Sequence, residues 1–463
     1  MTYKYFIFDF DGMLCDSYDH ISTALLTTLK ESRGISYPYK QIYDSFKVSF
    51  KTAFTTFNVT EQEKAIFMKR HEDINFLPRP KLYLPIKKLL QRIIESGGEN
   101  YIYTNRNESL FEYLDYFGIR QYVKDVIINA NKPDPKCLLD LISKYNLDKN
   151  QCVVIGDRAI DVDAAFNAKI DGILYDVDSR IFMHHATHVI KKIGEIYNFI
   201  DRPYKIKNNY HTHTCRCGHA IGYDEEYIIN AIKEGYQVLG MSDHIILPDI
   251  EKNYEYIESI ALLKEKYKDQ IEIKIGFEVE YYPYYLPFYK KLLDSKSIDY
   301  LIFGNHFYLE GDLNDKSNQI SFMDDFDDPS YLTLYYDLLE KAVETKMFKY
   351  IAHPDVFLKG YKKWDEHTIA LTYKIAELFQ KHNLYAELSG QGYRSKRRME
   401  YNGEIIPTYP FKEFYEILSK YNIKFVLGVD AHSPNQYDDD AVKYFCGMAE
   451  ELKLDVVYEI NDL

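Results

Sequence analysis

The sequence lacks any uninterrupted apolar run that approaches the roughly 18 residues of a membrane-spanning helix. Two acidic residues, Asp9 and Asp11, follow the N-terminus too closely for the apolar segment of a secretory signal peptide. Only six cysteines are scattered over 463 residues, so the pattern of a disulfide framework is absent. We therefore expect a cytoplasmic protein without a membrane partner.

An excess of basic residues is also missing. Lysine and arginine number 57 against 71 aspartates and glutamates, for a net charge of -14. Because a nucleic-acid-binding surface is usually basic, this balance argues against nucleic acid as a partner. An apolar content of 46% and a charged content of 28% are typical of soluble globular proteins, and the length allows two or three domains. Nothing in the composition indicates an oligomeric state.

In the first half, short apolar runs alternate with helical segments, and several of the runs end in polar residues. This alternation predicts a parallel, doubly wound sheet, which binds ligands at the carboxyl ends of its strands. Residues from about 16 to 80 are mainly helical, and the run at 173–175 is the last strand that we predict. The polar groups that follow the runs are Asp9-Phe10-Asp11-Gly12, Thr104-Asn105-Arg106, Lys132-Pro133, and Gly156-Asp157-Arg158 with Asp161 one turn later.

These groups resemble, in order, the four motifs of the haloacid dehalogenase (HAD) phosphohydrolases, over about residues 1 to 180. The resemblance implies a Rossmann-like domain over residues 1–200, with the helical segment at about 16–80 as its cap. Asp9 would be the nucleophile that forms an aspartyl-phosphate, and Asp11 would protonate the leaving group and then activate water. Thr104 and Lys132 would hold the phosphoryl oxygens.

The same resemblance implies a magnesium ion in this site, because Mg²⁺ prefers carboxylate oxygens as ligands. Its ligands would be Asp9, Asp11, Asp157 and Asp161. Met13 departs from the family, which usually has threonine or a β-branched residue there, so we expect activity with an altered turn. The alternative is a HAD domain that serves only as a scaffold.

In the second half, metal-binding residue types follow one predicted strand after another. His211 and His213 alternate, so on a strand both side chains point the same way, and His219 follows on a glycine-flanked loop. A (β/α) barrel gathers residues from the ends of several strands at one mouth. The predicted strands are 238–241, 271–277, 300–303, 350–352, 384–388 and 425–428, and the further candidate ligands are His244, Glu278, His306, His353, Asp430 and His432.

Nine such residues are too many for a single zinc ion. They suit a cluster of two or three cations, with Glu278 as the bridging carboxylate. Such a cluster activates water at neutral pH and supports in-line displacement at phosphorus. Cys215 and Cys217 lie in the same stretch, but a Cys-x-Cys spacing without a second cysteine pair does not indicate a metal site, so we do not expect them to be ligands.

Over residues 207–463 this half resembles the PHP (polymerase and histidinol phosphatase) phosphoesterases, and all nine positions match in order. The resemblance implies an α/β fold, a distorted (β/α)7 barrel, with three metals that are variously zinc, iron or manganese. The implied ligand sets are His211, His213, Glu278 and Asp430 for the first metal, Glu278, His306 and His353 for the second, and His219, His244 and His432 for the third.

Within that superfamily, Glu387–Arg394 resembles a stretch of the histidinol phosphatases that ends in Gly-x-Arg, and Arg394 would grip the phosphate. The likeness implies a metal-dependent phosphomonoesterase for a small phosphorylated metabolite, histidinol phosphate by preference, and hence a place in histidine biosynthesis. Ser389 and Val429 depart from the family pattern and leave the substrate open. The alternatives are a nucleotide phosphoesterase or nuclease, and a protein-tyrosine phosphatase.

Overall fold

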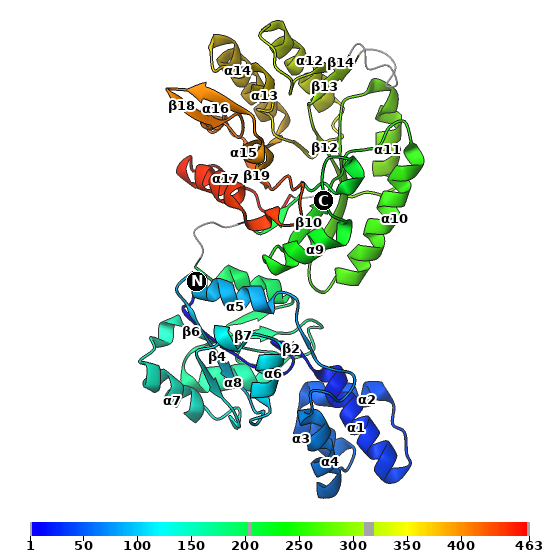
Figure 1. Cartoon of the computed structure of the whole chain (residues 1–463), viewed down its shortest axis with the longest axis vertical. Coiled ribbons are helices and arrows are strands. Elements are labelled where there is room, and N and C mark those ends of the chain that lie inside the picture. The colour runs from blue at the N-terminus through cyan, green and yellow to red at the C-terminus, as the bar shows by residue number, and fades with distance from the viewer. Residues whose placement is uncertain (1, 202–205, 310–318, 461–463) are drawn as a thin grey trace. The chain divides into compact units, whose positions relative to one another are not determined.

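The structure, a computed structural model, describes residues 2–201, 206–309 and 319–460 (Figure 1). The chain divides into two compact units, Met1–Arg202 and Pro203–Leu463. Each unit is built on its own parallel sheet. Among the described residues, no helix combines the length and the apolar character needed to cross a membrane.

The N-terminal unit contains a six-stranded parallel sheet. Side chains of the central strand β1 (Tyr5–Phe8) alternate between its faces, since Phe6 and Phe8 belong to one core cluster and Ile7 to another. Across the sheet the strands are β5 (Asp125–Ile127), β4 (Glu99–Tyr103), β1, β6 (Cys152–Gly156), β7 (Asp171–Tyr175) and β8 (His188–Ile190). The predicted α/β, Rossmann-like fold is confirmed, but β7 is not the last strand, because β8 pairs with its outer edge.

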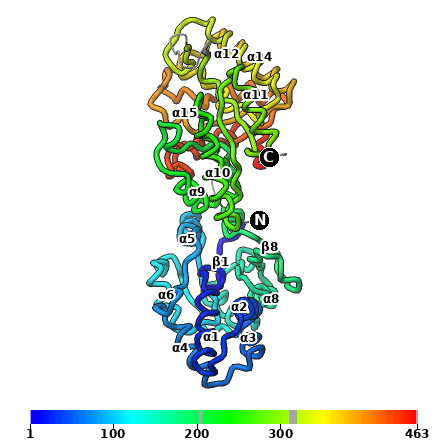
Figure 2. Tube along the Cα trace, turned by 90° about the vertical axis from the view of Figure 1, so that its right-hand side faces the viewer, coloured from blue at the N-terminus to red at the C-terminus, as the bar shows by residue number. Residues whose placement is uncertain are grey.

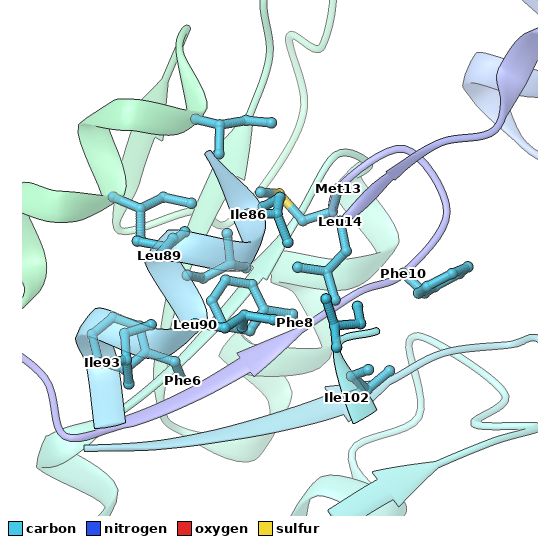
Figure 3. Packing of buried hydrophobic residues seen from close by; sticks show 14 of the residues in the cluster. Phe6, Phe8, Phe10, Met13, Leu14, Ile86, Leu89, Leu90, Ile93 and Ile102 are labelled. Atoms are coloured by element: carbon cyan, nitrogen blue, oxygen red, sulfur yellow. The ribbon is translucent and has the colours of Figure 1, made fainter. Parts of the chain in front are cut away.

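Helices cover both faces of this sheet, as a parallel sheet requires. Figure 3 shows the apolar side chains of one helix, spaced three and four residues apart, packed over Phe6 and Phe8. Met13 is fully buried in the same cluster, so its side chain fills the core. The helices are α5 (Ile86–Glu95) and α6 (Leu110–Tyr116) on this face, and α7 (Lys136–Tyr145) and α8 (Ala159–Ala168) on the other.

A helical segment is inserted after β1. The short strands β2 (Cys15–Asp16) and β3 (Lys81–Leu82) pair where the chain enters and leaves it. Four helices between them gather in one cluster (Figures 1 and 2) around a core of their own that contains Phe46 and Phe67. They are α1 (Tyr18–Arg33), α2 (Tyr39–Val48), α3 (Phe50–Thr56) and α4 (Glu61–Glu72).

The C-terminal unit is a parallel, seven-stranded barrel with helices around its outside (Figure 1). Its two edges meet because the amide of His213 donates to the carbonyl of Ala431 at 2.8 Å, and the amide of Ala431 to the carbonyl of His211 at 3.3 Å. The predicted distorted (β/α)7 barrel is therefore confirmed. In order, the strands are β9 (Asn208–Asn209), β10 (Val238–Met241), β11 (Glu272–Val279), β12 (Tyr300–Phe303), β15 (Tyr350–Ile351), β16 (Tyr385–Ser389) and β19 (Lys424–Gly428).

Helices and two hairpins complete this unit. The antiparallel hairpin β13 (Phe307–Leu309) and β14 (Gln319–Ser321) follows β12, and β17 (Arg398–Tyr401) with β18 (Glu404–Pro407) follows β16. The helices are α9 (Asp224–Lys233), α10 (Ile250–Tyr267), α11 (Leu286–Asp294), α12 (Ser330–Glu344), α13 (Leu358–Tyr361), α14 (Glu366–His382), α15 (Gln391–Arg394), α16 (Lys412–Leu418) and α17 (Asp440–Glu451).

Tyr300 is a central part of the barrel core. Its hydroxyl donates to the carbonyl of Tyr210 at 2.6 Å. The ring lies against two glycines on the neighbouring strands: a Cβ at Gly240 would be 2.1 Å from its hydroxyl oxygen, and one at Gly276 would be 2.5 Å from its Cζ. Any larger residue at these two positions would therefore displace the tyrosine that supports the barrel.

We expect Gly276→Ala to destabilise the C-terminal unit by about 1–3 kcal/mol, because the added methyl group overpacks the core. The chain has one tryptophan, Trp364, in this unit, so its fluorescence during urea unfolding reports on the barrel alone. Gly447→Ala is the matched control: a Cβ there meets no heavy atom within 4 Å, and alanine should stabilise its helix by up to about 1 kcal/mol. Equal urea unfolding midpoints for Gly276→Ala and Gly447→Ala would contradict the overpacking of Tyr300.

Candidate active sites

Three carboxylates gather at the carboxyl ends of β1 and β6. Asp9 directly follows β1, Asp157 follows β6, and Asp161 lies in the first turn of α8. All three are buried, and their oxygens lie within 4.8 Å of one another. Within the described part of the chain, Oδ2 of Asp9 and Oδ1 of Asp157 have no hydrogen-bond partner. Buried, unpaired carboxylate oxygens fit the predicted Mg²⁺, which is a hard cation.

The ammonium group of Lys132 neutralises part of this charge. Its Nζ lies 2.6 Å from Oδ1 of Asp9 and 2.7 Å from Oδ1 of Asp161, and the side chain is fully buried. Burial raises the pKa of Asp9, while Lys132 acts to lower it. Thr104 is buried at the end of β4, where its hydroxyl accepts a hydrogen bond from the amide of Arg106. The structure thus brings the nucleophile predicted from the sequence directly against Lys132.

Two residues of α1 and α2 also reach this site, and the sequence alone did not mark them. The hydroxyl of Tyr18 donates to Oδ2 of Asp157 at 2.6 Å. Nζ of Lys47 lies 3.9 Å from the same oxygen and 3.8 Å from the centre of the Tyr18 ring. Gly12 makes room for these groups, because it adopts a left-handed φ of 86° and a Cβ there would lie 2.2 Å from Oδ2 of Asp157.

Asp11 is held by a different partner. Arg106 grips both of its oxygens, with Nε 3.0 Å from Oδ2 and NH2 2.8 Å from Oδ1. Burial acts to raise the pKa of Asp11, but the ion pair outweighs it and holds the pKa below its ordinary value. The carboxylate is therefore turned toward Arg106 and not toward the predicted magnesium site. Its roles as a metal ligand and as a general acid stay predictions.

We expect Arg106→Met to destabilise the N-terminal unit by about 3–5 kcal/mol at neutral pH, because a buried carboxylate loses its partner. In the wild type, the lowered pKa of Asp11 adds stability above about pH 4, and this stability is lost as the pH falls further. In the variant, burial raises the pKa instead, so the deficit should shrink as the pH is lowered from about 8 to about 5.

Urea unfolding followed by far-ultraviolet circular dichroism measures that deficit at each pH. Trp364 lies in the other unit and serves as the internal control, since its fluorescence transition should not move. If the loss of unfolding free energy in Arg106→Met stays constant over this pH range, Arg106 does not act by compensating the charge of Asp11.

In the C-terminal unit, the nine predicted ligands surround one mouth of the barrel. Eight of them line a cavity of about 680 Å³, and the ninth, His211, is buried beside Glu278. Two of them stand on left-handed backbone, with φ of 28° at His353 and 50° at Asp430. Strain of this kind is concentrated at functional sites. The lining ligands are His213, His219, His244, Glu278, His306, His353, Asp430 and His432.

Glu278 lies at the centre of this group and divides it in two. Its Oε2 faces Nε2 of His211 at 3.3 Å and Nε2 of His213 at 3.1 Å. Its Oε1 faces Nε2 of His353 at 3.1 Å and Nε2 of His306 at 3.5 Å. A carboxylate whose two oxygens serve two sets of imidazoles has the arrangement of a bridge between two cations.

The remaining ligands add to these two sets. Oδ1 of Asp430 lies 3.6 Å from Nε2 of His211 and 3.5 Å from Nε2 of His213. This buried oxygen has no hydrogen-bond partner within the part of the chain that the structure describes. Nε2 of His219 and Nε2 of His432 lie 2.9 Å apart at the rim. Nδ1 of His244 faces Oε2 of Glu278 at 3.4 Å, and the centre of its ring lies 5.3 Å from that of His219, so its place in the third ligand set stays a prediction.

The protonation of these imidazoles follows from their surroundings. Burial lowers the pKa of His432 to about 3, and it also lowers the pKa of His244, so both rings are neutral and able to bind a cation. Burial opposes a charge on His213 as well, but its neighbours Cys217 and Glu278 raise its pKa to about 10. A divalent cation would have to displace that proton, so binding at His213 is linked to pH.

Two carboxylates, the buried Glu387 and the half-buried Glu280, orient the histidines from behind, and the sequence alone did not assign them this role. Glu387 accepts from Nδ1 of His211 at 2.9 Å and from the amide of His353 at 3.0 Å. Glu280 faces Nδ1 of His306 at 2.7 Å. The contacts to Nδ1 of His211 and of His306 leave Nε2 of both rings available for a cation, which is the usual arrangement behind metal-binding histidines.

Arg394 does not line the cavity. Its Nε donates to Oδ2 of Asp439 at 2.6 Å and its NH1 to the carbonyl of Val429 at 2.6 Å, so the guanidinium ties α15 to the start of α17. The cationic side chain that does line the cavity is Lys359, on α13, among the residues that the structure describes. The role of Arg394 in gripping phosphate therefore stays a prediction, whereas Lys359 is the better placed cation.

We expect Glu387→Gln to lower the affinity of the site for divalent metal by about 10- to 100-fold, because a neutral amide orients His211 less firmly than a carboxylate does. Competition with a chromophoric chelator on the full-length chain measures this change. Glu400→Gln, on the exposed face of β17, is the control and should leave the affinity unaltered. An unchanged affinity in Glu387→Gln, with the fold intact by circular dichroism, would rule out the orienting role.

Known proteins match both units. A family model described as haloacid dehalogenase-like hydrolase matches residues 6–175, and one described as PHP domain matches residues 209–391. The chain is 26% identical to a probable histidinol-phosphatase of Deinococcus radiodurans over 245 residues, which are 50% of this chain and 90% of the relative. It is 28% identical to a phosphoglycolate phosphatase of Psychrobacter arcticus over 192 residues, which are 37% of this chain and 82% of the relative.

Among solved structures, a histidinol phosphate phosphatase of Lactococcus lactis, complexed with zinc, L-histidinol and phosphate, shares 16% identity with a TM-score of 0.42, over 54% of this chain and 95% of that one. The family matches cover both sets of clustered residues except Asp430 and His432, which lie beyond the second match. The chain therefore joins a haloacid dehalogenase-like hydrolase domain to a PHP domain, and it is a phosphoric monoester hydrolase related to the histidinol phosphatases.

Proposed function

We propose that the C-terminal unit hydrolyses a small phosphomonoester, with histidinol phosphate as its preferred substrate. The observation that carries the proposal is the buried carboxylate of Glu278, whose two oxygens face separate sets of imidazoles 3.1–3.5 Å away. Two relatives that share 26% and 24% identity with this chain are named histidinol-phosphatases, and this supports the choice of substrate.

The residues at the mouth of the barrel would bind the cations and the substrate phosphate. His211, His213, Glu278 and Asp430 would hold one cation, and His306 and His353 would hold a second one with Glu278. When bound, such cations lower the pKa of a coordinated water and polarise the phosphoryl group. The half-buried ammonium of Lys359 gives the substrate phosphate an electrostatic partner on the cavity wall.

Several other lining residues suit an organic leaving group. Tyr282, Phe307 and Tyr409 line it, together with the carboxylate of Glu280. Aromatic faces and a carboxylate favour a flat or cationic group, and histidinol carries both an imidazole and an amine. Among the described lining residues, Lys359 is the one lysine or arginine. This balance favours a small cationic ester over the polyanionic substrate of a nuclease.

For the N-terminal unit we propose a second, Mg²⁺-dependent phosphatase. The buried Oδ2 of Asp9 has no hydrogen-bond partner among the described residues and would attack phosphorus, forming an aspartyl-phosphate as the substrate oxygen leaves. Lys132 would stabilise the negative charge of the transferring group. Asp11 would give its proton to the leaving oxygen and later take one from water, which requires that Arg106 release it. The cap residues Tyr18 and Lys47 would then meet the rest of the substrate.

The location and the partners follow from the same proposal. A soluble phosphorylated metabolite is the partner that both sites fit, and a cytoplasmic location stays a prediction. The rival for the N-terminal unit is a domain that has kept its fold and lost its activity.

Two variants separate the sites. We expect Glu278→Gln to reduce histidinol phosphate turnover by at least about 100-fold, because the carboxylate between the imidazole sets loses its charge. Asp9→Asn should leave that turnover unchanged, since it lies in the other unit. The turnover of each variant is measured as phosphate release from histidinol phosphate by the full-length chain with Zn²⁺ or Mn²⁺.

Each variant is the control for the other when small phosphomonoesters are screened with Mg²⁺. There, Asp9→Asn should abolish a turnover that Glu278→Gln retains. If Glu278→Gln still hydrolyses histidinol phosphate at the wild-type rate, the barrel is not the site at which this substrate is hydrolysed. If the screen finds no Mg²⁺-dependent turnover that Asp9→Asn abolishes, the result would favour the rival, in which the N-terminal unit has kept its fold and lost its activity.

A further inference from the structure

The turn that follows His213 places one cysteine in the cavity wall. This 3₁₀ turn, η4 (Cys215–Cys217), is anchored at its start by Thr214, whose amide and hydroxyl donate to Asp243 at 2.7 and 2.6 Å. Arg216 anchors it again through a double ion pair with Asp224. With the turn fixed in this way, Cys215 is exposed, whereas Cys217 is half-buried and lines the cavity.

The neighbouring pair of imidazoles has the electronic character of a cation site. Nδ1 of His219 contacts the carbonyl oxygen of Cys217 at 3.2 Å, and Nδ1 of His432 contacts the carbonyl oxygen of Asp430 at 3.1 Å. Each Nδ1 therefore carries the ring proton, and both Nε2 lone pairs face each other at 2.9 Å. Two facing lone pairs repel each other, and a cation bound by both removes that repulsion.

Two nitrogens are too few for a stable zinc site, which takes four ligands. His244, the third ligand expected from the family resemblance, has its Nδ1 against Glu278, and even with this histidine a fourth ligand is needed. The Sγ of Cys217 lies 4.0 Å from Nε2 of His219. It also lies within 4.8 Å of a ring nitrogen of His213, and Nδ1 of that ring is buried with no hydrogen-bond partner in the described part of the chain. Cys217 thus offers a further donor atom next to His219.

We propose that Cys217 is a sulfur ligand of the cation held by His219 and His432, and that this ligand makes the position selective for zinc or ferrous iron over manganese. The inference rests on the metal cluster of the proposed function. On binding, the S–H bond breaks, the proton passes to solvent and the sulfur lone pair forms the bond to the metal. The thiol donates to the carbonyl of Thr214 at 3.0 Å, and the new bond replaces that contact.

The selectivity follows from the softness of the donor. Thiolate sulfur binds zinc and ferrous iron well, whereas manganese prefers carboxylate and water oxygens. The other positions of the cluster combine imidazole with the carboxylates of Glu278 and Asp430, which accept manganese as well. A sulfur ligand at the rim would therefore distinguish this position from the two that share Glu278.

Cobalt(II) is the probe for the test, because a sulfur ligand gives it a strong near-ultraviolet charge-transfer band. The full-length, metal-free chain is titrated with Co²⁺ without oxygen. We expect the band in the wild type and in Cys215→Ser, and its loss in Cys217→Ser, while the visible bands of bound Co²⁺ remain in all three. Cys215 is the matched control, since it stands on the same turn but is exposed.

A competition titration then tests the selectivity. Cys217→Ser should bind zinc more weakly by about 10- to 100-fold, with its manganese affinity unchanged. Bound Co²⁺ without the charge-transfer band in the wild type would overturn the proposal, and so would loss of the band in Cys215→Ser. A chain that binds no Co²⁺ would overturn both this inference and the cluster. A charge-transfer band in a chain that fails to hydrolyse histidinol phosphate would overturn the proposed substrate alone.

Discussion

The burial of the Glu278 carboxylate is the constraint on which the C-terminal unit depends. The residue is 1% exposed, and its oxygens face imidazoles that come from segments as far apart as His211 and His353. A buried charge without compensation costs several kcal/mol, so those segments must converge together. A parallel barrel achieves this, because the carboxyl ends of all its strands open at the same mouth. The left-handed backbone at His353 and Asp430 is strain that the surrounding barrel supports.

In the N-terminal unit, the charge of the buried carboxylates is partly compensated by a lysine of the same unit. Asp9 and Asp161 are as deeply buried as Glu278, but Lys132 lies between them and supplies a permanent positive charge. Only part of the negative charge is compensated, since Asp157 accepts a hydrogen bond from Tyr18, and the cations of Lys47 and Arg158 lie 3.9 and 4.0 Å from its oxygens. The remaining charge is what a divalent cation and the cap would share.

Much of this could be predicted from the sequence, because apolar runs and the polar residues after them are local signals. The strand predicted at 300–303 coincides with β12, and the one at 271–277 overlaps β11, which continues to Glu278 and Val279. Partners that come from distant segments could not be predicted. Asp439 holds Arg394 away from the cavity, and Arg106 takes Asp11. β8 was missed because it has three residues, of which Val189 and Ile190 alone are apolar, and so short a run does not indicate a strand.

The donor atoms of the two units differ in the kind of cation that they bind best. Asp9, Asp157 and Asp161 offer oxygen alone, and Lys132 leaves little room for a ligand of another kind, so this site favours a hard cation such as magnesium. At the barrel mouth imidazole nitrogens predominate, and nitrogen donors bind zinc or iron far more tightly than magnesium. The two donor sets therefore differ in chemical preference, oxygen for a hard cation in one unit and nitrogen for zinc or iron in the other.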